Sequence, residues 1–242
     1  MNFSSVPTNT TVNEIKISGI ISDDQLKPMM ERLTGLLGTK EKPFKEWTNV
    51  YKTLSSLPPP QSSTIQSEDA TVVSSLSLSK EFEIHVVADV VKTNVLEKME
   101  VKETEKIVWK DIKSLGVYVL PQKDMPFKSN VRTVSLSGVY GGSPLTMLEM
   151  LACEFVYEYV KEGYRFISKT GTYVDIYTLK KVMRRGFPLK ENCVPVNDTA
   201  SYGVEAYKFA PQHLETTYAM EKELTTLASN LANLEIYLGK VD

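Results

Sequence analysis

The chain has 242 residues with 28 Lys+Arg against 30 Asp+Glu, a formal net charge of -2, so no bulk positive field favours nucleic-acid binding. This length predicts one large β-rich domain or two small ones, and we expect one. The apolar runs are short and broken by charges, and the start shows no signal-peptide pattern, so we expect an intracellular protein that does not bind membranes.

The N-terminal region predicts a polar arm followed by a strand and a helix. Residues 1–11 are polar and irregular, which predicts a disordered arm before a single domain over residues 12–242. Isoleucines then alternate over residues 15–21, which is typical of a strand with one buried face. Ser22 and Gln25 have the spacing of a capping box, and apolar residues at helical spacing follow up to Gly38, whereas Pro28 predicts that the regular helix starts nearer Lys27.

The middle of the chain predicts mostly sheet. Patterns rich in β-branched and aromatic residues predict strands over residues 44–57, 72–78, 81–91, 109–120 and 130–139. The Pro- and Ser-rich residues 58–70 predict a flexible polar insertion, and the charged residues 98–106 predict a turn or loop.

The C-terminal third predicts two helices and further strands. Ser143 and Pro144 have the pattern of a helix start, and we expect that helix to continue to Glu162 and to end at Gly163. The strands are expected over residues 164–168, 172–182, 202–209 and 234–240, with a helix opening at Pro211. Residues 202–209 are the candidate partner strand for the hairpin before them.

The element order predicts an α+β fold. Helices are too few and too unevenly placed for βαβ repeats, so the sheet is expected to be large and mainly antiparallel. Closure into a β-barrel with flanking helices removes exposed edges, and we expect such a barrel.

No residue pattern predicts a cofactor or a structural metal. His85 and His213 lie in different elements without ligands at metal-binding spacing, and the two cysteines form no framework. Glu81 and Glu83 alternate on one strand, so their side chains point the same way and are able to share a divalent ion inside a barrel. This pair supports an alternative function, a tunnel-type metal-dependent phosphohydrolase, although a solvated strand face explains it equally well.

Two adjoining segments are candidates for binding. Residues 180–185 place four cations in six positions, which indicates a localisation signal, a phosphate contact or a solvated rim. The loop after Arg185 carries four apolar residues that either contact a partner or fold back on the barrel: Phe187, Leu189, Val194 and Pro195. Glu205 and Glu235 each stand alone on a predicted strand.

Several motifs together resemble the Mediator subunit 18 family. The N-terminal IKISGIISDD and ERLTGLLG resemble that family's opening strand and helix. The stretch LACEFVYEYVKEGYRF, followed by a turn at Gly171 and VDIYTLKKV, resembles its helix, glycine and hairpin. The matching positions are Glu158, Val160, Lys161, Gly163, Phe166, Lys169, Tyr177 and Lys180. The later SYGVEAYKFA and LEIYLGK also fit, whereas residues 57–128 do not align.

The resemblance implies a nuclear, non-enzymatic scaffold subunit of the Mediator head module, which links regulators to RNA polymerase II. It implies a β-barrel with flanking helices, similar in shape to the tunnel triphosphatases. It also implies pairing with Mediator subunit 20, binding of a C-terminal helix of Mediator subunit 8, and contacts with other head-module subunits and the polymerase machinery.

Overall fold

The computed structural model describes residues 10–53, 83–97, 100–119, 129–139, 142–196, 201–232 and 238. Within these ranges the chain forms nine strands, three α-helices and one 3₁₀ turn. In chain order they are β1 (Thr10–Ser22), α1 (Asp23–Leu37), β2 (Lys42–Thr53), β3 (Glu83–Glu97), β4 (Glu100–Val119), β5 (Asn130–Gly138), α2 (Pro144–Met150), β6 (Cys153–Ile167), β7 (Tyr173–Val182), η2 (Lys190–Asn192), β8 (Cys193–Pro195), β9 (Ser201–Ala210) and α3 (Leu214–Ala232).

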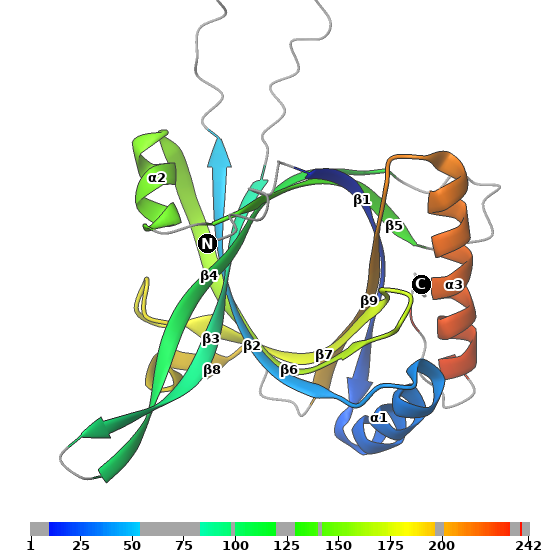
Figure 1. Cartoon of the computed structure of the whole chain (residues 1–242), viewed down its shortest axis with the longest axis horizontal. Helices are drawn as coiled ribbons and strands as arrows, with labels where there is room; N and C mark the ends of the chain where they lie inside the picture. The colour runs from blue at the N-terminus through cyan, green and yellow to red at the C-terminus, as the bar shows by residue number, and fades with distance from the viewer. Residues whose placement is uncertain are drawn as a thin grey trace, which may run out of the picture.

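Eight of these strands close into an antiparallel barrel. Neighbouring strands follow the order β6-β2-β3-β4-β5-β1-β9-β7, and pairing between β6 and β7 joins the two ends. The short β8 pairs with the outer edge of β7. Viewed end-on, the strands surround one central opening, with α1 and α3 on one side and α2 on the other (Figure 1). The predicted fold class is confirmed.

The main apolar core lies outside the barrel wall. On β1, the buried Ile15 and Ile17 face the helices, whereas the intervening Lys16 lines the lumen. The same alternation on β7 and β9 places their aliphatic residues beneath α1 and α3. The fully buried members of this core include Ile15, Met29, Leu33, Phe166, Val174, Ile176, Val204, Ala206, Leu224 and Leu231. The lumen is therefore the polar face of the sheet.

Two smaller clusters cover the opposite side of the barrel. Trp47, Val160 and Val182 pack together, and the Trp47 ring lies 5.2 Å from that of Trp109, centroid to centroid. The short helix α2 contributes Leu148, which packs near Tyr51. These contacts attach the β6 side of the barrel to the β3–β4 hairpin.

The N-terminus of α1 differs from the sequence prediction. The helix begins at Asp23, four residues before the predicted start, because Gln25 Oε1 accepts a hydrogen bond from the Ser22 backbone N–H at 3.1 Å. Pro28 is accommodated inside the helix. Gly38 ends the helix in the left-handed conformation, with φ of 64°, as its position predicts.

The long helix predicted over residues 144–162 is wrong. Helix α2 ends at Met150, Ala152 takes a left-handed φ of 56°, and the chain then enters strand β6 at Cys153. Residues 153–165 pair with β2 on one side, while Tyr159 to Ile167 pair with β7 on the other. Pairing with two strands satisfies the backbone, so tertiary structure overrides a pattern that also fits a helix.

The turn predicted over residues 98–106 is also wrong for residues 100–106, which belong to β4. They pair with β3 from Glu97↔Glu100 to Val91↔Lys106. β2 pairs with β3 only as far as Asp89, and β5 pairs with β4 only from Asp111 onward. The remainder of the hairpin therefore projects beyond the barrel as a two-stranded ribbon (Figure 1).

Barrel closure between β6 and β7 depends on Gly163. A Cβ atom at this position would lie 2.0 Å from the backbone oxygen of Ile176 and 2.7 Å from the Cα of Tyr177. Because Cβ atoms do not approach backbone that closely, only glycine fits here.

Some sequence predictions fall outside the described residues. They are the insertion over residues 58–70, the strand over residues 72–78, most of the C-terminal strand and residues 1–9 of the arm. Thr10 and Thr11, at the end of the predicted arm, begin β1. In the described part of the chain, every helix is too short or too polar to cross a bilayer.

Candidate functional site: the barrel lumen

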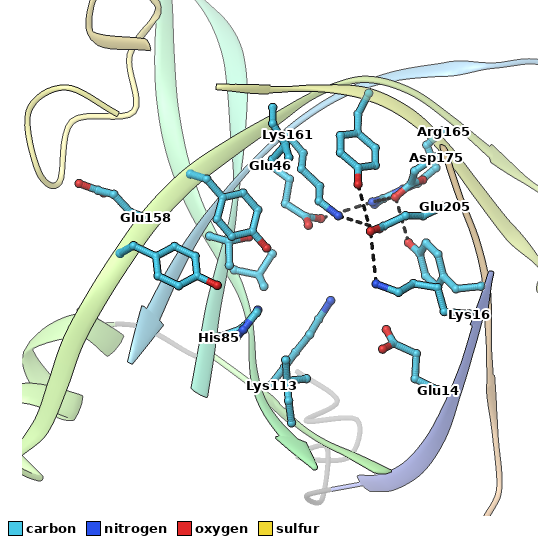
Figure 2. A pocket seen from close by; sticks show the side chains of 18 of the residues that line it. Glu14, Lys16, Glu46, His85, Lys113, Glu158, Lys161, Arg165, Asp175 and Glu205 are labelled. Carbon is cyan, nitrogen blue, oxygen red and sulfur yellow. Dashed lines mark hydrogen bonds and ion pairs between the residues drawn. The ribbon is translucent and has the colours of Figure 1, made fainter. Parts of the chain in front are cut away.

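The lumen contains a cavity of about 630 Å³ lined by alternate residues of the barrel strands. Charged side chains dominate the lining (Figure 2). Its charged residues are Glu14, Lys16, Glu46, Lys113, Arg132, Glu158, Lys161, Arg165, Asp175, Lys181 and Glu205. The lining thus contains six cations and five carboxylates, a formal excess of one positive charge, and the Glu158 carboxylate points away from the other charges toward Trp47 Nε1 and the Gly186 N–H.

One cluster in the lumen centres on Arg165. Its Nε and Nη2 atoms each donate to an Asp175 carboxylate oxygen at 2.7 Å, and Nη2 also reaches Glu46 Oε2 at 3.4 Å. The Tyr207 hydroxyl donates to Asp175 at 3.3 Å. Burial raises the pKa of Asp175, and the bonds from Arg165 offset only part of that rise. The paired guanidinium and carboxylates join β2, β6 and β7 across the lumen wall.

A second cluster centres on Glu205. Lys161 Nζ lies 2.7 Å from Oε2, while Lys16 Nζ and the Tyr177 hydroxyl lie 3.3 and 3.0 Å from Oε1. Burial alone would raise the pKa of Glu205, but the attraction of Lys161 and Lys16 outweighs it and lowers this pKa to about 2. The carboxylate is therefore ionised throughout the physiological range and holds two lysines from different strands.

The opposite wall carries His85 and Lys113. These residues are direct cross-strand partners on β3 and β4, and both line the cavity. Burial, Arg132 and Lys113 lower the pKa of His85 to about 4, although the nearby Glu83 opposes this, so the imidazole is neutral at pH 7. On the adjacent wall, Arg132 Nε donates to Glu14 Oε2 at 2.5 Å.

The structure places only one member of the predicted carboxylate pair. Glu83 lies at the start of β3 with its side chain 44% exposed, and Glu81 lies outside the described residues. Glu83 Oε2 is 3.5 Å from His85 Nε2. Among the described residues, no three His, Cys, Asp or Glu side chains are grouped to hold a metal ion.

The four predicted partner-binding residues differ in exposure. Phe187 is 43% exposed and Val194 is 48% exposed, and Pro195 is exposed beside it, whereas Leu189 is half-buried. The segment folds back on the barrel through η2 and β8, where Val194 pairs with Lys181. The backbone of this segment folds back on the barrel, as one interpretation expects. Three of its apolar side chains face outward, so they are also available to contact a partner, as the other expects.

The basic cluster over residues 180–185 is divided among different environments. Lys180 pairs with Glu162 at 2.5 Å, and Arg185 pairs with Glu149 at 3.1 Å. The Arg184 guanidinium stacks 4.3 Å from the centroid of the Phe187 ring, while Lys181 lines the lumen. Its four cations therefore do not form a single patch.

Sequence reasoning missed the lumen clusters. Glu205 stands alone on its strand in the sequence, yet the barrel surrounds it with groups from β1, β6 and β7. The available signal was the alternation of charged with aliphatic residues on β1 and β9, which indicates strands with one polar and one apolar face. That alternation does not show which strands are neighbours in the barrel, so it does not show which charges pair.

The fold and the lumen define a class of protein, a closed antiparallel β-barrel with a charged lumen and an apolar core between its outer wall and flanking helices. The model of the family described as "Med18 protein" matches residues 13–242. The chain therefore belongs to the Mediator subunit 18 family, whose members are subunits of the Mediator head module.

One solved structure shows the same fold, and a second gives a weaker match. A chain in the structure of the Schizosaccharomyces pombe Mediator head module matches with a TM-score of 0.65 and 17% identity, over 93% of this chain and 97% of that one. The PH1819 protein from Pyrococcus horikoshii OT3 matches with a TM-score of 0.45 and 11% identity, over 90% of this chain and 89% of that one. No curated protein sequence matches the chain.

Proposed function

We propose that the chain is a non-enzymatic scaffold subunit of Mediator that works in the nucleus and relays regulatory signals to RNA polymerase II through protein contacts. The observation that carries this proposal is the pairing of charges in the lumen. Arg165 is neutralised by Asp175 and Glu46, and Lys16 and Lys161 share Glu205. A polyphosphate substrate would meet an excess of one positive charge, which is too little to balance it.

The proposed partners are Mediator subunit 20, a C-terminal helix of Mediator subunit 8, other head-module subunits and the polymerase machinery. Family membership supports this assignment. The exposed apolar residues Phe187, Val194 and Pro195 are the proposed contacts on this chain, together with the adjoining Leu189. Apolar anchors surrounded by polar residues supply most of the binding energy at protein interfaces.

Co-purification tests this surface. The double variant Phe187→Asp/Val194→Asp places charges at two exposed positions, so we expect recovery of head-module partners to fall about tenfold or more. Leu214→Asp is the matched control, because Leu214 is an exposed apolar residue at the start of α3, in another part of the chain. Circular dichroism should be unchanged in both variants. Equal recovery in the double variant and the wild type would exclude this loop as the contact.

A triphosphatase assay tests the rival function. The scaffold proposal predicts no hydrolysis of tripolyphosphate with Mn²⁺ or Mg²⁺ by the purified chain. Hydrolysis that Glu83→Gln abolishes would establish the phosphohydrolase instead. Hydrolysis that survives Glu83→Gln would show that Glu83 is not required for it.

A further inference from the structure

Two polar groups of the lumen, His85 and Lys113, lack the partners that most of the other lumen charges have. His85 Nε2 is buried without a hydrogen-bond partner, and Glu83 Oε2 lies 3.5 Å from it. Among the described residues, no carboxylate lies within ion-pairing distance of Lys113. Its positive charge lowers the pKa of Glu46 and that of His85. Buried polar groups are normally satisfied, so the His85 Nε2 atom requires an explanation, and the half-buried Lys113 lies beside it.

The two groups are adjacent. His85 and Lys113 are opposite each other in the antiparallel register of β3 and β4 and line the same cavity. Opposite residues on one face of such a pair have Cβ atoms about 5 Å apart, so both side chains are able to contact one small ligand. Lys113 extends from the β4 wall into the open part of the lumen (Figure 2).

The surrounding charges favour an anion. On the facing wall, Lys16 and Lys161 share the single carboxylate of Glu205, while Arg165 is shared by Asp175 and Glu46, so these charges balance one another. The carboxylates of Glu14 and Glu46 already have cationic partners, since Glu14 accepts from Arg132 and Glu46 from Arg165. Glu83 Oε2, 3.5 Å from His85 Nε2, belongs to a side chain that is 44% exposed. A ligand bearing one negative charge would balance Lys113 and the excess of one positive charge in the lining.

We propose that Lys113 and His85 form a binding site for one small tetrahedral oxyanion of phosphate size inside the barrel lumen. Lys113 donates a charge-assisted hydrogen bond to one oxygen, and the His85 Nε2–H donates to a second. The cavity of about 630 Å³ admits such an ion together with water. A tripolyphosphate carries more charge than the lumen balances and is expected to bind less tightly than inorganic phosphate.

The two histidines of the chain provide a direct measurement. NMR spectra of the imidazole groups should show a saturable shift of the His85 resonances when inorganic phosphate is added at constant ionic strength and pH 7. His213, just before α3, lies outside the lumen lining and is the internal control. Sodium chloride at equal ionic strength should leave both resonances unchanged.

Variants separate a built site from a general salt effect. Lys113→Gln should weaken apparent phosphate affinity at least about tenfold, the loss typical of a charged hydrogen bond. Lys113→Arg should retain binding, because it keeps the charge and the donors. Lys106→Gln removes a cation from the projecting ribbon of the same strand and should have no effect. Circular dichroism confirms that each variant is folded.

Three outcomes would overturn the proposal: no saturable shift of His85, equal shifts of His85 and His213, or unchanged affinity in Lys113→Gln. The site is independent of the scaffold function, because co-purification of partners does not measure lumen occupancy. Tighter binding of tripolyphosphate than of phosphate would contradict the proposed size and charge of the ligand.

Discussion

At the scale of single residues, the lumen is organised by carboxylates that each hold cations from other strands. Glu205 is the clearest example, because it accepts from Lys161, Lys16 and Tyr177 at distances of 2.7 to 3.3 Å. Such a group joins four strands, its own β9 and the neighbouring β1, β6 and β7, through one side chain. Removing its charge leaves two largely buried lysines without their partner. This destabilises the fold more than replacing the carboxylate and the lysines together by apolar residues would.

Glu205→Gln should lower stability at pH 7 by roughly 3 kcal/mol, the value equivalent to lowering its pKa from 4.5 to about 2. A lowered folded-state pKa gives stability that is present above about 4.5 and is lost as pH falls toward about 2. The difference in free energy of unfolding between wild type and variant should therefore become smaller as the pH falls from about 4.5 to about 2. Urea denaturation at several pH values measures it, and a gap that stays constant down to pH 2 would contradict this account.

The individual residues of the lumen were the part of the molecule least predictable from sequence. Glu81 and Glu83 attracted attention because alternate glutamates share a strand face, a local property that sequence displays. The partners of Glu205 lie 28 to 189 residues away in the chain. Their convergence depends on which strands are neighbours, and periodicity within a strand carries no information about that.

At the scale of elements, strand β6 explains both the main error and the closure of the barrel. Its EFVYEYV segment has apolar residues at spacings that suit a helix and aromatic and β-branched residues that suit a strand. Pairing with β2 and β7 decides between them. The hairpin with β7 was predictable, because Gly171 and the alternation after it are local signals, and Gly171 has φ of 81°.

Gly163→Ala tests how tightly β6 and β7 approach each other. The added methyl group would meet the Ile176 oxygen at 2.0 Å, so we expect a loss of about 3 kcal/mol as the strands separate. Gly35→Ala is the matched control, because its Cβ meets nothing within 4 Å and it lies inside α1. Alanine there should raise stability by about 0.5–1 kcal/mol. Thermal denaturation measures the change in stability of each variant. A small change in both variants would show that β6 and β7 do not approach each other so closely.

At the scale of the whole molecule, the fold class was predictable because helices are few and amphipathic strands are many. The pairing β7–β9 was expected from the alternation of residues 202–209, and it is observed. The position of the core was harder to predict. Alternation identifies the two faces of a strand, but it does not show which face lines the barrel lumen and which packs against helices.

Deletion of residues 58–70 tests the single-domain organisation. These polar residues lie between β2 and β3, which pair directly from Glu46↔Asp89 to Lys52↔Glu83. Shortening a loop between paired strands changes its closure entropy only slightly, so we expect the free energy of unfolding to change by less than about 1 kcal/mol. Chemical denaturation measures this. A large loss, or a second unfolding transition, would show that the segment contributes to a folded unit.

The outward-facing core has a consequence for how this barrel can change. Folding energy and lumen chemistry belong to alternate residues of the same strands, so Ile15 and Ile17 are constrained by helix packing while Lys16 is constrained by the lumen. Substitution of the lumen-facing residues therefore leaves the helix-facing residues in place. A protein engineer could therefore rewrite the lumen for a new ligand while keeping the residues that hold the molecule together, whereas a one-residue insertion in a strand would exchange the two sets.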